Sequence, residues 1–266
     1  MATARTAFNH MGLVTRNLEA TLQFYQEGLG IPLWHVWGHE NKDYILNLGD
    51  DSYLEIMVEK HNEPMPKGCW ERLNLRTDNV RESLNRAIAH GGTLVEDVRF
   101  YNAVEALPNP KPYYSAVVRG AEGEEIGLIQ EIGGEVSECR VHSVELAVTC
   151  LERSVKAYQN AFGLFASPVS EDGHACLLDL RGGVALKLLQ REFEAPMPRG
   201  VFAHIAFKDE NIHQRYEWAA SHGMEGTVPP MFCLVNEATP FPVQFWASGF
   251  AGPDHEDVTL IKDVII

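Results

Sequence analysis

Hydrophobic and polar residues follow one pattern in the first quarter of the chain. Residues 8–15 (FNHMGLVT) predict a strand, and Asn17 precedes a segment, 18–30 (LEATLQFYQEGLG), whose apolar residues have helical spacing and which ends at Gly30. Three short segments follow, LWHVW, DYILNLG and SYLEIMVE, rich in β-branched and aromatic residues and bounded by polar residues or glycine. This quarter is therefore predicted to be a βαβββ unit.

The same order of elements is expected three more times. Further units begin at ERLNLRT, at HSVELAV and at FAHIAF, so the chain is predicted to hold four βαβββ units, two in each half. The longest stretch without a clear pattern is 227–257, in the fourth unit. It is rich in aromatic and apolar residues, so we interpret it as an irregular loop that covers a pocket.

The two halves also repeat each other in sequence. LEATLQFYQEGLG at 18–30 matches LERSVKAYQNAFG at 151–163, and EPMPKG at 63–68 matches APMPRG at 195–200. The nearly constant spacing predicts a duplication, with one domain in residues 1–133 and another in 138–266. Each residue then has a counterpart, and counterparts that differ chemically indicate that the two copies have specialised.

Composition narrows the classes of function. The 266 residues suit about two domains. The net charge of −15 argues against nucleic acid and anionic membrane surfaces as partners, and no apolar run is long enough to span a membrane. Five cysteines without a CxxC motif argue against a disulfide framework or a thiolate zinc site. We expect a cytoplasmic protein, monomeric or homodimeric, whose partner is a small-molecule substrate.

Three groups of motifs resemble a known superfamily: HMGLVTRNLEATLQFYQEGLG with SYLEIMVE, VHSVELAVTCLERSVKAYQNAFGL with GVALKLLQ, and HIAFKDENI. They are similar to the vicinal oxygen chelate superfamily, which includes glyoxalase I, extradiol dioxygenases and bleomycin-resistance proteins. The resemblance implies an α+β fold, in which four βαβββ modules form two cupped, incompletely closed mixed β-barrels with helices outside. It also implies a divalent metal inside a cup, held by residues from the first and last strands of each module.

Carried onto this chain, the ligand positions hold a mixed set of residues. In chain order they are His10, Glu55, Arg72, Gly127, Ser143, Lys187, His204 and Thr259. Only His10, Glu55 and His204 suit a divalent metal. This departs from the four-ligand pattern of the family and puts a simple glyoxalase-like centre in doubt.

The pairing of the modules decides whether these residues meet, and both pairings occur in the superfamily. If module one pairs with two, no cup gathers more than two ligands, and Arg72 could neutralise Glu55. If one pairs with four, His10, Glu55 and His204 share a cup with Thr259 in the fourth place. The other cup then holds Arg72 and Lys187, which could bind an anionic ligand or be paired within a structural copy. We expect the one-plus-four pairing because it forms one coherent site.

Two histidines and one glutamate leave coordination positions open. Such a set suits Fe²⁺ foremost, and Mn²⁺, Zn²⁺, Ni²⁺ or Co²⁺ are possible. Asp257 lies on the same strand face as Thr259 and is a candidate catalytic base or fourth ligand. Further candidates for contact with the substrate are Thr259, Trp37, Trp246, Arg72 and Lys187.

Two functions follow as hypotheses. The first is a metal-dependent enzyme, a dioxygenase or a lyase or isomerase, that acts on a small oxygenated organic substrate. The alternative is a metal-free protein that binds and sequesters a drug or metabolite. The metal content of the protein separates them.

Overall fold

The computed structural model describes residues 6–38, 42–60, 63, 65–102, 111–134, 140–235 and 243–263. These residues form four successive βαβββ units, as the hydrophobic pattern predicted. The residues at the predicted boundary between the halves, 135–139, lie outside the described ones.

The first half contains units one and two. Unit one comprises β1 (Ala7–Thr15), α1 (Leu18–Leu22) continued by the π-helix η1 (Gln23–Gly28), β2 (Leu33–Trp37), β3 (Asp43–Asn47) and β4 (Tyr53–Val58). Unit two comprises β5 (Trp70–Arg76), α2 (Val80–Ala89), β6 (Thr93–Tyr101), β7 (Tyr113–Arg119) and β8 (Glu125–Glu131). The side chain of Asn17 accepts a hydrogen bond from the backbone of Ala20, so the predicted cap of the first helix is confirmed.

The second half contains units three and four. Unit three comprises β9 (Val141–Val148), α3 (Leu151–Phe162), β10 (Phe165–Ala166), β11 (Ala175–Asp179) and β12 (Ala185–Gln190). Unit four comprises β13 (Phe202–Lys208), α4 (Ile212–Ala220), β14 (Glu225–Val235), β15 (Val243–Ala251) and β16 (Asp257–Asp263). The prediction of an irregular loop over 227–257 was wrong for most of that stretch, because β14 and β15 pair there as antiparallel strands.

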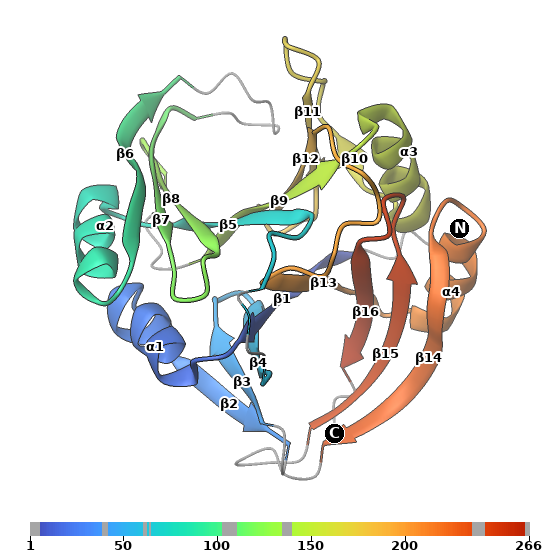
Figure 1. Ribbon diagram of the computed structural model, residues 1–266. Coiled ribbons are helices and arrows are strands. Elements are labelled where there is room, and N and C mark those ends of the chain that lie inside the picture. Colours follow the sequence, from blue (N-terminus) through green and yellow to red (C-terminus); the bar gives the residue numbers. More distant parts are fainter. Residues whose placement is uncertain are drawn as a thin grey trace.

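The strands form two mixed eight-stranded sheets. Their orders are β14-β15-β16-β13-β1-β4-β3-β2 and β10-β11-β12-β9-β5-β8-β7-β6. Units one and four therefore share one sheet, and units two and three share the other, which is the pairing we expected. Figure 1 shows each sheet curled into an open cup with the helices outside, so the α+β fold class is confirmed.

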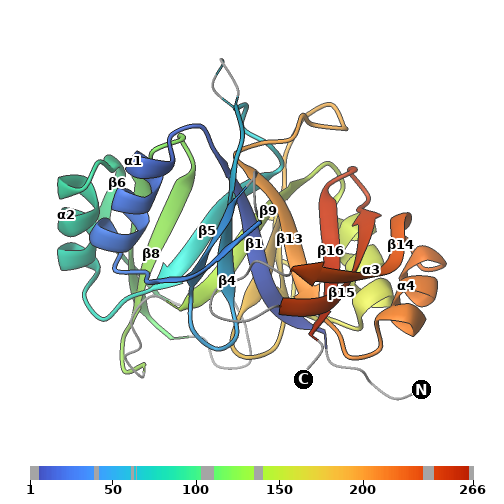
Figure 2. The ribbon, with the colours of Figure 1, turned by 90° about the horizontal axis from the view of Figure 1, so that it is seen from below.

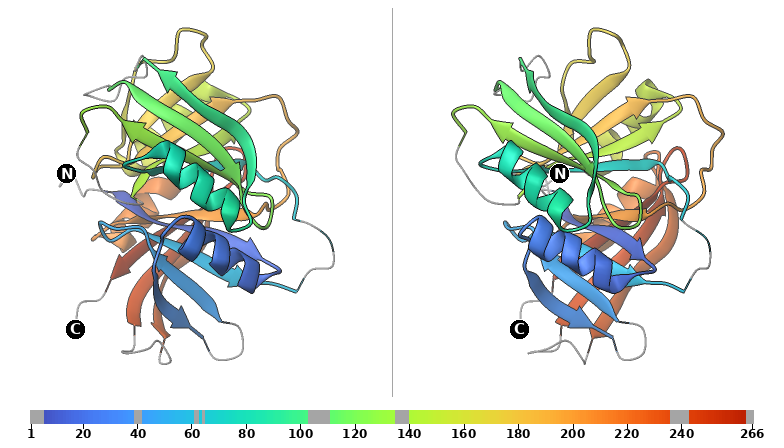
Figure 3. Two further views of the ribbon diagram at one scale, coloured as in Figure 1. Left: turned by 90° about the vertical axis from the view of Figure 1, so that its left-hand side faces the viewer. Right: turned by 60° about the vertical axis from the view of Figure 1, so that its left-hand side comes forward.

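The helices connect the two units of the same half, whereas the sheets connect units of different halves. Helix α2 packs against η1, and α3 packs against α4, so the helix pairs lie at opposite ends of the molecule (Figure 2). Buried hydrogen bonds repeat in both halves: the hydroxyl of Tyr25 donates to Glu124, and that of Tyr158 donates to Glu256. Figure 3 shows one sheet above the other, with the helices of the first half in front.

The core runs through both sheets without a break. Its largest fully buried side chains include Tyr25, Phe24, Tyr158 and Phe162. The two repeated motifs end at Gly68 and Gly200, which lie against each other: a Cβ atom on Gly68 would meet the backbone of Gly200 at 2.7 Å. Both copies therefore keep glycine, because only a residue without Cβ permits this approach. No helix in the described part of the chain combines the length and the apolar composition that crossing a bilayer requires.

Candidate metal centre

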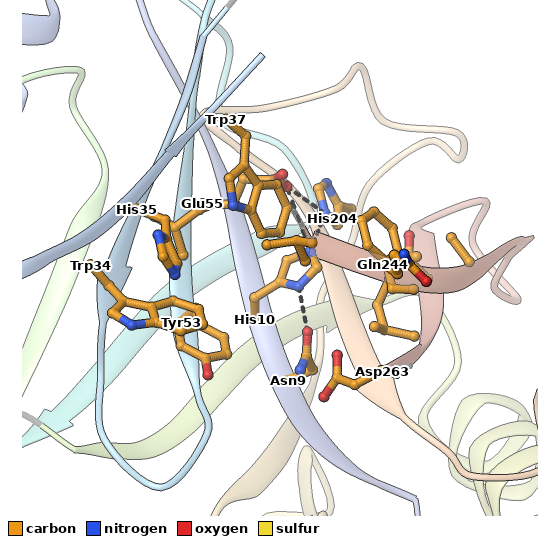
Figure 4. Close-up of a pocket in the computed structure, with 16 residues that line it drawn as sticks. Asn9, His10, Trp34, His35, Trp37, Tyr53, Glu55, His204, Gln244 and Asp263 are labelled. Carbon is orange, nitrogen blue, oxygen red and sulfur yellow. Dashed lines mark hydrogen bonds and ion pairs between the residues drawn. The ribbon is translucent and has the colours of Figure 1, made fainter. Parts of the chain in front are cut away.

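Three neighbouring strands place the candidate ligands on one face of the first sheet. Gly12 on β1 pairs with His204 on β13 and with Glu55 on β4. His10 lies two residues before Gly12, so strand alternation places it on the same face. All three side chains therefore point into the cup formed by units one and four (Figure 4).

The three side chains meet at their polar atoms. Nε2 of His10 lies 3.0 Å from Nε2 of His204, and Oε2 of Glu55 lies 3.5 Å from the first and 3.4 Å from the second. One ligand atom from each residue falls within 4.8 Å of the others. The side chains are between 12% and 16% exposed, so the group is sheltered but reachable.

Burial sets the protonation of this group. It lowers the pKa of His10 to about 4, although the charge of Glu55 opposes the shift. Burial also disfavours the carboxylate of Glu55, but a hydrogen bond from His204 and nearby positive charges outweigh it, so the pKa of Glu55 lies below its usual value. A neutral imidazole at His10 and an ionised carboxylate at Glu55 are the forms that bind a divalent cation.

A bulge in β1 supplies a partner for His10. The pairing of β1 with β13 shifts between Phe8 and His10, which leaves Asn9 as the extra residue. Its buried side chain places Oδ1 2.7 Å from Nδ1 of His10. With Nδ1 protonated and donating to Asn9, the lone pair of Nε2 faces His204 and Glu55. Metal-binding histidines are commonly oriented by such a contact.

We expect Asn9→Ala to lower the affinity of the site for Fe²⁺ or Zn²⁺ by about 10- to 100-fold, because His10 would lose the acceptor that fixes its ring and tautomer. Anaerobic competition against a chromogenic chelator measures the affinity. The melting temperature of metal-free protein serves as the control for folding. Wild-type affinity in a folded Asn9→Ala protein would contradict the role given to Asn9.

Gly12 makes room for the group. A Cβ atom at this position would overlap the imidazole ring of His204, which passes over β1 toward His10. The sequence analysis did not single out this glycine.

A cavity of about 700 Å³ opens onto the three ligand candidates. Its lining is mostly aromatic and aliphatic and comes from units one and four. The lining residues are Asn9, His10, Trp34, His35, Trp37, Ile45, Tyr53, Glu55, His204, Val243, Gln244, Phe245, Ala247, Thr259, Ile261 and Asp263. The cavity is large enough for a bicyclic organic compound beside the ligand group.

Two of the predicted contacts with the substrate lie in this cavity, and two other predictions fall outside it. Thr259 and Trp37 line the cavity. Trp246 does not, because Phe245 and Ala247 on either side point inward and alternation turns Trp246 toward His213 of α4. Asp257 is exposed at the start of β16. The cavity extends along β16 from Thr259 to Asp263 and does not include Asp257, so the structure does not bring this predicted base to the ligand group.

The second cup contains ion pairs in place of a ligand group. Arg72 and Lys187 lie on β5 and β12 of the other sheet, far from the cavity in the strand order. Arg72 bonds to Glu125 at 2.9 Å and lies 3.8 Å from Glu145. In the strand register, Glu145 on β9 lies opposite Arg72 on one neighbouring strand and opposite Lys187 on the other. It therefore occupies the position that Gly12 occupies in the first sheet. This supports the structural interpretation of that cup over an anion site.

Several residues of the cavity were missed in the sequence. Asp263 follows Thr259 by four residues, so strand alternation alone could have identified it. The same rule applies to Tyr53, two residues before Glu55 on β4. Trp34 and Phe245 carry no such signal, since they come from strands whose curvature decides what they face. Burial and the charge of Glu55 raise the pKa of Asp43, on β3 beside this wall, to about 6.

Comparisons with known proteins agree with this architecture. The family model described as the Glyoxalase/Bleomycin resistance protein/Dioxygenase superfamily matches residues 140–233. Glyoxalase I from Zea mays has the same fold, with a TM-score of 0.75 at 17% identity over 97% of this chain and 93% of that one. A putative dioxygenase from Bacillus subtilis subsp. subtilis str. 168 gives a TM-score of 0.71 at 13% identity over 98% of this chain and 86% of that one. No curated protein matches the chain.

The family model agrees with the resemblance to the vicinal oxygen chelate superfamily over residues 140–233, and the solved structures share the fold over nearly the whole chain. At identities this low, the solved structures show the fold alone. Function has to be argued from the site.

Proposed function

We propose that the chain binds one divalent metal through His10, Glu55 and His204 and acts as a metal-dependent enzyme on a small oxygenated organic substrate. The observation that carries the proposal is the convergence of two imidazoles and one carboxylate, from three strands, at the base of a cavity of about 700 Å³. A buried glutamate needs a partner of opposite charge, and a cation in this place would supply it.

The donor set fits such an ion. Two nitrogen ligands and one carboxylate on one side leave positions open on the side of the cavity, which suits Fe²⁺ best and also admits Mn²⁺, Zn²⁺, Ni²⁺ or Co²⁺. A bound metal would polarise the oxygen atoms of a substrate. This set favours dioxygenase-like chemistry, and glyoxalase- or isomerase-like chemistry is the other form of the same proposal.

The chain itself would supply orientation and shelter. Asn9 orients His10, and Thr259, one strand beyond His204, places a hydroxyl on the cavity wall. The apolar side chains Ile45, Val243 and Ile261 limit water around a bound substrate. The proposal also includes a small-molecule substrate as the partner, a monomeric or homodimeric protein, and a location in the cytoplasm.

Metal analysis tests the proposal. We expect anaerobically purified protein to carry about one equivalent of Fe, Mn or Zn, and a chelator to remove it. Returning metal at about 100 times its Kd should stabilise the protein by about 2.7 kcal/mol. For a chain of this size that is a rise in melting temperature of roughly 5–10 °C.

The alternative function predicts the opposite result. A metal-free sequestering protein would purify without a stoichiometric metal, and neither chelator nor added metal would change its melting temperature. In that case His10, Glu55 and His204 would only bond to one another, as their distances of 3.0 to 3.5 Å allow.

A further inference from the structure

The charged groups of the cavity wall are acidic. Among the lining residues, Glu55 and Asp263 carry carboxylates, and none is a lysine or an arginine. Two cations outside the lining are paired with carboxylates: Lys208 bonds to Asp263, and Arg199, whose charge acts on Glu55, bonds to Glu59. A metal at the ligand group could meet one substrate oxyanion, but a further anionic group would be buried beside carboxylates without a partner.

The apolar wall presents flat surfaces. The rings of Trp37, on β2, and Phe245, on β15, stack across the cup with centroids 5.8 Å apart and planes 23° apart. Those of Trp34 and Tyr53 stack with centroids 4.7 Å apart and planes 10° apart. Aromatic faces favour contact with planar rings, so the wall suits a flat ligand better than a branched one.

One polar hydrogen of this wall has no acceptor within the part of the chain that the structure describes. Nε1 of Trp37 is buried and has no hydrogen-bond partner among the described residues. Figure 4 shows the indole projecting into the cavity on the same side as Glu55 and His10. A buried N–H without an acceptor costs free energy that an acceptor on a ligand would recover.

Resting on the proposed function, we propose that the cavity selects an uncharged aromatic compound that carries a hydrogen-bond acceptor, and that the indole N–H of Trp37 donates to that acceptor. Trp37 is then a specificity-determining residue. The acidic wall excludes ligands that carry an extra negative charge, such as carboxylated conjugates.

Three probes of one shape test this proposal: 2-naphthamide, which is neutral and has an acceptor, 2-naphthoate, its anionic isostere, and naphthalene, which has no acceptor. Binding is measured by calorimetry or ligand-observed NMR on the purified full chain, with and without chelator. We expect 2-naphthamide to bind at least 10-fold more tightly than 2-naphthoate in chelator-treated protein. Trp37→Phe keeps an aromatic ring and removes the N–H, so it should weaken 2-naphthamide about 3- to 10-fold and leave naphthalene unchanged.

Trp246→Phe is the matched control, because Trp246 packs outside the cavity against His213. It should leave the binding of all three probes unchanged. The proposal is overturned if none of the probes binds, if 2-naphthoate binds as tightly as 2-naphthamide, or if Trp37→Phe weakens naphthalene as much as 2-naphthamide. The probes are compared in metal-free protein, so their result does not depend on metal binding. A failure of the selectivity proposal can therefore be told apart from a failure of the proposed metal site, which the metal content of the untreated protein tests.

Discussion

Replacing His204 by alanine is expected to lower the affinity for metal by more than about 100-fold and to abolish metal-dependent turnover. Loss of a residue that hydrogen-bonds to a metal ligand typically lowers metal affinity about 10- to 100-fold. Loss of one of only three ligands should lower it further. The variant would keep His10 and Glu55, whose side chains are 3.5 Å apart, but two ligands on one face hold a cation weakly. Anaerobic chelator competition and metal analysis after gel filtration measure the effect.

His142 offers a matched control. It is a partly buried histidine on β9 of the other sheet, and burial lowers its pKa to about 3, so it is neutral near pH 7. His142→Ala removes the same ring from a similar environment and should leave metal affinity and stoichiometry unchanged. If His204→Ala protein retains metal at the wild-type ratio, or His142→Ala protein loses it, the ion is held elsewhere.

The three ligand candidates could be predicted from the sequence because each occupies a repeated position. His10 and His204 lie on the first strands of their units, and Glu55 lies on the last strand of the first. The repeated motifs fix how positions correspond between the halves, and the resemblance says which positions face the cup. Residue type then separates the ligand candidates from their counterparts. Arg72 and Lys187, the counterparts of His204 and Glu55, cannot serve as ligands for such a metal.

The surroundings of the ligands could not be predicted in the same way. Asn9 reaches His10 only because β1 bulges against β13, a strand about 190 residues away in the chain. The local sequence carries no sign of that mismatch. The 227–257 stretch shows no clear pattern in the sequence, yet Pro229 and Pro230 lie in β14, an edge strand, where a missing N–H is tolerated.

The register also explains why only one of the two cups gathers these ligands. Gly12 stands between His204 and Glu55 and leaves space above the sheet. Its counterpart, Glu145, stands between Arg72 and Lys187 and places a carboxylate in that space. In the first cup the space above Gly12 holds the imidazole of His204, which reaches His10, whereas in the second cup the same position holds a carboxylate 3.8 Å from Arg72. The difference at this one position is therefore as important as the ligands themselves.

Gly12→Ala should consequently lower metal affinity by more than about 10-fold without removing a ligand. The new methyl group would overlap the imidazole of His204 and push its Nε2 away from His10. Adding a methyl to a packed site commonly costs about 1–3 kcal/mol of stability, so the variant should fold with a lower melting temperature. Metal affinity is measured by chelator competition, and stability by urea unfolding of metal-free protein.

Two further variants separate crowding at His204 from general strain in the sheet. Gly249 lies on β15 of the same sheet, outside the cavity, and Gly249→Ala would place a methyl group 2.9 Å from the hydroxyl of Thr227. This variant should lower stability without changing metal affinity. In the double variant Gly12→Ala with His204→Ala the ring that clashes is gone. The loss of unfolding free energy in the double variant should therefore be smaller than the sum of the two single losses by about 1 kcal/mol or more, the size of coupling found for residues in contact. Strict additivity would mean that Gly12 does not act through His204, and that its missing side chain is not what lets the imidazole of His204 reach His10.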